Sequence, residues 1–284
     1  MSTQCISPFV NEGQSLPCGK CFNCKKRRTS GWSFRLNKEA EVSTSAFFVT
    51  LSYEQPHLTK NGFMNLCKQD LQKYLKRLRK LNDNKLKYYA VGEYGGKFNR
   101  PHYHIIIFNA LETTLEKAWK GYTSIDEKSP HARKNTAKNG YTHVGTCTPA
   151  SVAYTLEYIS KGGQVPKHAQ DDRQKEFSLM SKGLGKNYLT ENMKNWHKDI
   201  LSERMYCSTW DGKKLAMPRY YKEKIYTKAQ RLHISMKVQK KQKEEWDNMS
   251  YRQQQEKENQ EYLINIEKCR KLARKKDNNL NQKF

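Results

Sequence analysis

The stretch Arg100-Pro101-His102-Tyr103-His104-Ile105-Ile106-Ile107-Phe108-Asn109 decides the fold prediction for this chain. Beyond its two histidines the stretch is apolar on both faces, which is typical of a strand in the middle of a sheet. We therefore predict a strand over residues 102–109 at the centre of a sheet. Pro101 lies at the very start of this strand, where its missing N–H costs little pairing.

The sequence on both sides of this strand predicts further strands and helices. A strand over 86–94 precedes it and ends at Gly95-Gly96, so the two are expected to pair as antiparallel neighbours. Other strands are expected over 46–53 and 141–145, and helices over 30–42, 65–81, 112–120 and 148–161. This order predicts the α+β class, with a central antiparallel sheet, flanking helices and a helical C-terminal region.

Composition divides the chain into four expected segments. Residues 1–30 form a cysteine-rich basic arm, and residues 31–165 hold the sheet with its helices. Residues 166–227 are expected to form a mixed, mainly helical extension. Residues 228–284 are rich in Lys, Gln and Glu, which predicts a basic tail that is either an exposed helix or disordered.

The charge balance points to a polyanionic partner. The chain has 53 Lys and Arg against 28 Asp and Glu, a formal net charge of +25. Such an excess is usually balanced by nucleic acid, and it indicates a partner rather than a reaction. No apolar run approaches the length of a membrane helix, and the N-terminus lacks the pattern of a secretory signal. We therefore expect a cytoplasmic protein with no membrane partner.

Two histidines of the central strand are the first candidates for chemistry. His102 and His104 are two positions apart, so their side chains point to the same face of the sheet. Neighbouring imidazoles suit Mn²⁺, Mg²⁺ or Zn²⁺. Glu93, at the end of the preceding strand, would lie beside one of them and add a carboxylate ligand. A glutamate exposed at a strand end is an equally good interpretation of this residue.

The helix predicted over 148–161 carries the second set of candidates. Tyr154, Tyr158 and Lys161 lie along one stripe of this helix, away from its apolar stripe. A tyrosine hydroxyl that faces a metal-bound phosphodiester can cut it and stay attached to one end. Lys161 would hold the phosphate or assist the deprotonation of tyrosine.

Four cysteines near the N-terminus form a separate candidate metal site. Cys5, Cys18, Cys21 and Cys24 favour metal binding or free thiols over disulfides in a chain that is expected to be cytoplasmic. Four thiolates suit a structural Zn²⁺. Three closely spaced cysteines are also similar to part of an iron–sulfur pattern. We interpret the group as a small structural zinc element.

Basic and aromatic residues of the sheet leave more than one function open. Backbone contacts to single-stranded DNA are expected from Lys85, Lys87, Lys97 and Arg100. One alternative is a non-catalytic RRM-like module that stacks bases on Phe47, Phe48, Tyr88 and Tyr89. A second alternative is a metal-dependent nuclease that activates water, which requires more carboxylates than Glu93 supplies.

Taken together, these motifs resemble those of the HUH superfamily of rolling-circle replication initiators and relaxases. His102-Tyr103-His104 resembles the metal-binding motif, and Tyr154 and Tyr158 with Lys161 resemble the two-tyrosine catalytic motif. Residues 48–52 are similar to the early strand motif of these initiators. More narrowly, residues 17–24, 92–104 and 177–181 resemble the replication initiators of microviruses, single-stranded DNA phages of the gokushovirus kind.

The resemblance implies an HUH endonuclease core with an RRM- or ferredoxin-like palm, a divalent Mg²⁺ or Mn²⁺, and a 5′-phosphotyrosine intermediate. The implied substrate is single-stranded or supercoiled phage DNA at the replication origin. No Gly-x-x-x-x-Gly-Lys-Ser/Thr loop occurs in the sequence, so a host helicase and a host DNA polymerase are the implied partners. Single-tyrosine relatives retain the tyrosine that corresponds to Tyr158, and the order in which the two act stays open.

Overall fold

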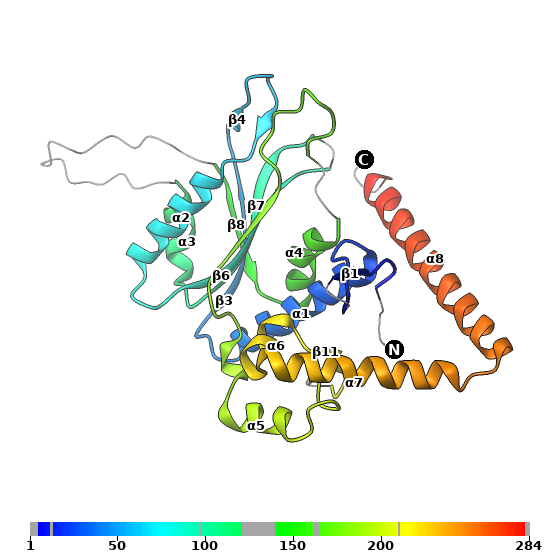
Figure 1. Cartoon of the computed structure of the whole chain (residues 1–284). Helices are drawn as coiled ribbons and strands as arrows, with labels where there is room; N and C mark the ends of the chain where they lie inside the picture. The colour runs from blue at the N-terminus through cyan, green and yellow to red at the C-terminus, as the bar shows by residue number, and fades with distance from the viewer. Residues whose placement is uncertain are drawn as a thin grey trace, which may run out of the picture. The chain divides into compact units, whose positions relative to one another are not determined.

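The fold is described from a computed structural model of the chain, which covers residues 5–11, 14–96, 98–120, 140–161, 165–209 and 211–281 (Figure 1). Within these ranges, side chains are described except at residues 14, 158–161, 268–269 and 271–281. The chain divides into two compact units, Arg35–Lys186 and Met1–Phe34 with Asn187–Phe284. Each unit is described by itself.

A five-stranded antiparallel sheet with the order β8-β3-β7-β6-β9 forms the centre of the Arg35–Lys186 unit. Its strands are β3 (Ala46–Ser52), β6 (Lys87–Tyr94), β7 (Pro101–Phe108), β8 (Thr142–Thr146) and β9 (Phe177–Met180). The strand predicted over 102–109 corresponds to β7, and its central place is confirmed. The predicted antiparallel pairing of the two strands around Gly95-Gly96 is confirmed as well.

Helices cover both faces of this sheet, which confirms the α+β class. Helices α2 (Lys68–Leu81) and α3 (Glu112–Lys120) lie on one face, and α4 (Pro149–Lys161) lies on the other (Figure 1). The alternation of side chains along β3 and β7 explains the two faces. Val49, Ile105 and Ile107 belong to the core beneath α2 and α3. Thr50 and His104, which alternate with them, point to the face that α4 covers.

Helix α1 (Phe22–Ala40) begins eight positions earlier than the helix predicted over 30–42. Its first turns contain the basic run 25–28, whose Lys and Arg are good helix formers although the prediction placed them in an irregular arm. Its last residues belong to the Arg35–Lys186 unit. There Leu36 is fully buried, and the buried Glu39 pairs with Lys87 at 2.7 Å.

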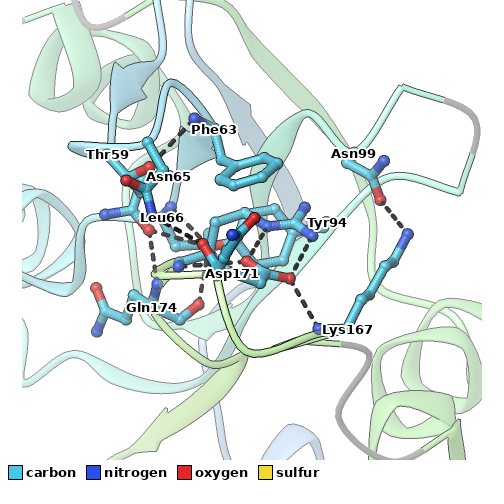
Figure 2. A network of polar contacts seen from close by, with 12 residues as sticks. Thr59, Phe63, Asn65, Leu66, Tyr94, Asn99, Lys167, Asp171 and Gln174 are labelled. Carbon is cyan, nitrogen blue, oxygen red and sulfur yellow. Dashed lines mark hydrogen bonds and ion pairs between the residues drawn. The ribbon is translucent and has the colours of Figure 1, made fainter.

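A polar network fixes the segment 165–176, which leads into β9 (Figure 2). Asp171 and Arg173 form a buried ion pair, with 2.8 Å between Oδ2 and Nη2. The guanidinium of Arg173 lies 5.0 Å from the ring centre of Tyr94. The hydroxyl of Tyr94 donates to the carbonyl oxygen of Gln174 at 2.8 Å, across 80 positions of the chain. This network therefore anchors the end of β6, next to Glu93.

The same network reaches the short hairpin of β4 (His57–Leu58) and β5 (Met64–Asn65). The backbone N–H of Gln174 donates to the side chain of Asn65 at 2.7 Å. Lys167 donates to Asn99, in the turn between β6 and β7, at 3.0 Å. Segments that are distant in the sequence are thus joined at one end of the sheet.

The Met1–Phe34 and Asn187–Phe284 unit has its own core, in which the rings of Phe34, Tyr188 and Tyr221 pack together. Its elements are β1 (Phe9–Asn11), β2 (Gln14–Leu16), α5 (Glu191–Asp199), β10 (Tyr206–Ser208), β11 (Lys214–Ala216), α6 (Arg219–Ile225), α7 (Lys228–Asp247) and α8 (Tyr251–Asn281), with η1 (Lys186–Tyr188) at its border. Within the described part of the chain, no helix has the length and apolar character that a membrane span requires.

Several elements differ from the prediction because they are short or depend on distant partners. The stretch 166–227 was expected to be mainly helical, yet it contains β9, β10 and β11. These strands have three or four residues each, too few to show a period in the sequence. The arm over 1–30 contains the β1–β2 hairpin, and the tail is helical through Asn281. The division into four segments remains a prediction.

Candidate metal and tyrosine site

Glu93, His102 and His104 meet on the sheet face that α4 covers. Glu93 is directly opposite His102 in the β6–β7 ladder, so their side chains share a face with His104. The Nε2 atoms of His102 and His104 lie 2.5 Å and 3.0 Å from Oε1 of Glu93. Glu93 and His104 are buried, with 3% and 5% exposure. The structure therefore brings together the three residues that the sequence suggested as ligands.

Contacts outside this triad orient both imidazoles. Nδ1 of His102 lies 3.0 Å from the carbonyl oxygen of Arg100, which only accepts hydrogen bonds. This Nδ1 therefore carries a proton, and in the neutral ring Nε2 keeps its lone pair. Nδ1 of His104 lies 3.0 Å from the hydroxyl of Thr50, its partner on β3. Outer contacts of this kind are typical of metal-binding histidines.

The carboxylate of Glu93 retains unused capacity to bind a cation. Its Oε2 atom is buried and has no hydrogen-bond partner among the described residues. Burial alone raises the pKa of Glu93, but the hydrogen bonds with His102 and His104 outweigh burial, and the net pKa is lowered. A buried, ionised carboxylate beside two imidazole nitrogens fits a divalent cation such as Mn²⁺ or Mg²⁺.

Tyr154 of α4 lies directly against this triad. Its ring meets the ring of His104 edge to face, with 5.1 Å between centroids. Phe48 also contacts His104, stacked at 5.5 Å. Tyr154 is 44% exposed, so part of it remains accessible to solvent. Burial raises the pKa of Tyr154, and the carboxylates of Glu93 and Glu157 raise it further, so the phenol keeps its proton near neutral pH.

The start of α4 explains how this helix is placed. Thr148 was predicted as its N-cap, and its hydroxyl accepts a hydrogen bond from the N–H of Ser151 at 3.2 Å, as an N-cap does. Leu156 is fully buried on the side that faces the sheet. Tyr158 and Lys161 belong to the last turns of α4, but their side chains lie outside the described residues.

The basic residues expected to contact DNA do not all gather at the triad. Arg100 lies beside it, and its Nη2 donates to the carbonyl oxygen of Tyr53 at 2.8 Å. Lys87 lies at the opposite end of β6 from Glu93, about 20 Å away at roughly 3.3 Å per residue. Its ammonium pairs with a buried glutamate, as described above. Lys85 is exposed just before that strand. Lys97 lies outside the described residues.

Two residues that support the triad had no assigned role in the sequence analysis. Thr50 holds His104, and Gly92 allows β6 and β9 to approach. A Cβ atom on Gly92 would lie 3.1 Å from the ring of Phe177 and 3.2 Å from the ring of Tyr103. Both roles depend on which residues pair across the sheet. Strand alternation would have found them only after the register was known.

The four N-terminal cysteines form a second candidate metal group. Their Sγ atoms all lie within 4.8 Å of one another, and those of Cys5 and Cys21 are 3.8 Å apart. A tetrahedral Zn²⁺ with Zn–S bonds of about 2.3 Å places its sulfur ligands about 3.8 Å apart. The separation between Cys5 and Cys21 is far longer than a disulfide bond of about 2.05 Å. The arrangement therefore fits a four-thiolate site.

The thiols of this group have strongly different pKa values. Backbone N–H groups of Cys21 and Lys20 lower the pKa of Cys18 to about 6. Burial raises the pKa of Cys21, but N–H groups of Ile6 and Cys24 outweigh it, and the net pKa is lowered. Burial raises the pKa of Cys24 to about 12. A cation at the centre is what would allow all four to ionise together.

A third group of metal-ligand type, His57, Cys67 and Asp70, is accounted for by hydrogen bonds. Asp70 lies 2.7 Å from Nε2 of His57 and accepts from the hydroxyl of Tyr53 at 3.0 Å. These contacts join the β4–β5 hairpin to the start of α2. We assign this group a structural role.

Comparison with known proteins agrees with this fold and site. Residues 46–163, which contain the triad and α4, match the family described as Replication-associated protein ORF2. The chain belongs to this family of replication-associated proteins. It is 31% identical over 225 residues to Replication-associated protein ORF2 of Spiroplasma virus 4, across 76% of this chain and 69% of the relative.

Two other phage proteins are similar. Replication-associated protein ORF4 of Chlamydia phage 1 is 27% identical over 219 residues, which cover 73% of this chain and 53% of that protein. Replication-associated protein VP4 of Bdellovibrio phage phiMH2K is 25% identical over 215 residues, which cover 74% of this chain and 67% of that protein. The resemblance to microvirus replication proteins is thereby confirmed. No solved structure matches the chain significantly.

Proposed function

We propose that this protein is a site-specific single-stranded DNA endonuclease and strand transferase that starts rolling-circle replication through a 5′-phosphotyrosine intermediate. The observation that carries the proposal is the contact between the ring of Tyr154 and the imidazole of His104. It places a nucleophile of the required type beside a donor set suited to a divalent cation. The strong positive charge of the chain fits a DNA substrate.

In the proposed reaction, the phenolic oxygen of Tyr154 or Tyr158 attacks the scissile phosphorus. A new P–O bond forms to tyrosine, the P–O3′ bond breaks, and the released 3′ oxygen takes up a proton. The phenol loses its proton as the new bond forms. Glu93, His102 and His104 would hold the metal ion, which when bound draws negative charge from the nonbridging phosphate oxygens.

The covalent link makes the step reversible. Attack of a free 3′-OH on the phosphotyrosine rejoins DNA ends and releases the tyrosine. With two tyrosines, one holds the 5′ end while the other cuts again. Lys161, three positions after Tyr158, is proposed to bind the phosphate and offset its charge.

The alternative functions have less support. For a stacking platform on an open sheet, aromatic residues must be accessible, yet Tyr89 is fully buried and Phe48 packs against His104 and Tyr154. For a nuclease that activates water, the candidate group over the described residues contains one carboxylate, that of Glu93. The tyrosine mechanism makes use of both the imidazole pair and the adjacent phenol.

The proposal is tested by looking for a covalent adduct. The protein is incubated with Mn²⁺ and labelled single-stranded oligonucleotides that tile the replicon encoding the chain. We expect a protein–DNA adduct that survives denaturation, carries the DNA segment on the 3′ side of the cut through its 5′ phosphate, and maps to Tyr154 or Tyr158 by mass spectrometry.

The double variant Tyr154→Phe/Tyr158→Phe should form no adduct. Tyr251→Phe is the matched control, since this tyrosine is 77% exposed on α8. Cleavage by the double variant without an adduct would contradict the tyrosine mechanism. Binding without cleavage by the unaltered protein would support the binding-only alternative.

We also propose that Cys5, Cys18, Cys21 and Cys24 hold a structural Zn²⁺. The sulfur geometry and the lowered pKa values of two thiols support this assignment. Elemental analysis of the purified chain should find one zinc per molecule. Cys21→Ser should lose it, whereas Cys147→Ser, at a half-buried cysteine outside the group, should retain it. Iron and inorganic sulfide in place of zinc would contradict the assignment.

A further inference from the structure

The cysteine group closes the base of a hairpin. The chain leaves the group at Cys5 and returns at Cys18, whose N–H donates to Sγ of Cys5 at 3.2 Å. Between them lies the β1–β2 hairpin, in which Phe9 pairs with Leu16. Two strands of three residues are too short to be stable by themselves in water. The hairpin therefore depends on the cysteine group for its stability.

This hairpin exposes large apolar side chains. Phe9 is 52% exposed, Val10 is 74% exposed, and Ile6 just before them is 44% exposed. Adjacent residues of a strand point to opposite faces, so neither face of the hairpin is covered at Phe9 and Val10. Three such side chains within five positions do not contribute to a core. Their exposure indicates a surface that binds a partner.

The residues around the hairpin are strongly basic. Residues 1–36 contain one acidic residue, Glu12, against six basic residues, Lys20, Lys25, Lys26, Arg27, Arg28 and Arg35. Lys20, Lys26 and Arg28 are exposed. Four thiolates around Zn²⁺ carry a formal charge of about −2, which leaves a clear positive excess. A polyanion is the partner that this charge complements.

Apolar and aromatic side chains beside exposed cations are the combination that binds single-stranded DNA. Bases stack on aromatic rings without strong sequence preference, while cations contact the phosphates. We propose that Phe9, Val10, Lys20, Lys26 and Arg28 form a second contact surface for single-stranded DNA. It is separate from the residues that cut. The proposal rests on the zinc assignment above and does not depend on the tyrosine chemistry.

The test measures binding without cutting. A fluorescent single-stranded oligonucleotide of mixed sequence is titrated with the full-length Tyr154→Phe/Tyr158→Phe variant, and binding is followed by anisotropy. Adding Phe9→Ser/Val10→Ser should weaken binding by about 10-fold, as expected for the loss of one stacked base. Adding Lys26→Gln/Arg28→Gln should weaken binding and reduce the slope of log K against log salt by about 1.4, since each phosphate contact contributes about 0.7.

Matched controls remove similar side chains from the Arg35–Lys186 unit. Val42→Ser/Leu111→Ser removes two apolar side chains that are 60% and 55% exposed. Lys117→Gln/Lys120→Gln removes two charges from α3, on the sheet face away from the triad. Both controls should bind the oligonucleotide as tightly as the parent variant does.

Zinc content and adduct formation separate the remaining outcomes. In the otherwise unaltered protein, Lys26→Gln/Arg28→Gln should keep its zinc and form the adduct with a short oligonucleotide at the normal rate. Parental affinity in both hairpin variants would overturn the proposal and leave the apolar residues to a protein partner. Weaker binding that accompanies loss of zinc in every variant would also overturn it. Failure of the unaltered chain to form an adduct would count against the cutting reaction alone.

Discussion

The ring of Tyr154 meets the ring of His104 edge to face, with 5.1 Å between their centroids. One residue belongs to helix α4 and the other to the central strand β7. Because Val152 and Leu156 are buried on the same helix, α4 is held on the sheet and the contact is a fixed part of the fold. The predictions below concern the residues that hold each side of this contact in place.

Glu93→Gln should abolish tight metal binding at the triad. The substitution keeps the size of the side chain but removes the negative charge that a cation requires. Since the loss of an outer contact alone lowers metal affinity by about 10- to 100-fold, loss of a ligand should lower Mn²⁺ affinity by more than about 100-fold. Calorimetric Mn²⁺ titration checks this outcome. Glu41→Gln, at an exposed pair with Lys38, is the control, and equal affinities in the two variants would contradict the ligand role.

Thr50→Val should weaken Mn²⁺ binding by about 10- to 100-fold. Valine has the same shape as threonine but cannot hydrogen-bond Nδ1 of His104, which Thr50 contacts at 3.0 Å. The Mn²⁺ concentration that gives half-maximal adduct formation should rise, while the rate at saturating Mn²⁺ should change less. Thr50→Ser keeps the hydroxyl and should stay close to the unaltered protein. If serine and valine behave alike, the hydrogen bond does not position the imidazole.

Gly92→Ala should destabilise the Arg35–Lys186 unit by about 1–3 kcal/mol through overpacking. The added Cβ would lie 3.1 Å from the ring of Phe177 and 3.2 Å from that of Tyr103. Gly145→Ala, in β8 of the same sheet, is the control, because its Cβ would meet nothing closer than an oxygen of Phe48 at 4.0 Å. Urea unfolding of both variants gives the comparison. Equal midpoints would show that β6 and β9 can separate at little cost.

Asp171→Asn should remove an acid-sensitive part of the stability. The hydrogen bond from Arg173 holds the pKa of Asp171 well below its ordinary value. Because the folded-state pKa is depressed, the stabilisation is fully present above the unfolded value of about 4 and is lost as the pH falls below it. The gap in urea midpoint between the unaltered protein and Asp171→Asn should be wide at pH 7 and should narrow as the pH falls below about 4.

The control for this pH dependence is Asp83→Asn, at an exposed residue between α2 and β6. This variant should follow the unaltered protein across the whole pH range. A gap for Asp171→Asn that stays constant from neutral to acidic pH would contradict the role of the Asp171–Arg173 pair.

Much of the site followed from local sequence patterns. The pairing of the two strands around Gly95-Gly96 was enough to predict that Glu93 lies near the histidines. Other contacts could not be read in this way. Strand β9 has four residues and pairs with β6 across a long separation in the chain, so it has no local period. Its place depends on Phe177 packing over Gly92.

By itself, the sequence determined the central strand with its two histidines, the adjoining strand that carries Glu93, and the helix that carries the tyrosines. These features depend on alternation and helical spacing among residues that are close in the chain. Only the tertiary structure decided that α4 covers the histidine face, that Thr50 and Phe48 contact His104, and that the cysteines close a hairpin. The reason is physical: each of these contacts depends on strand register and side-chain packing between distant segments, and local composition specifies neither.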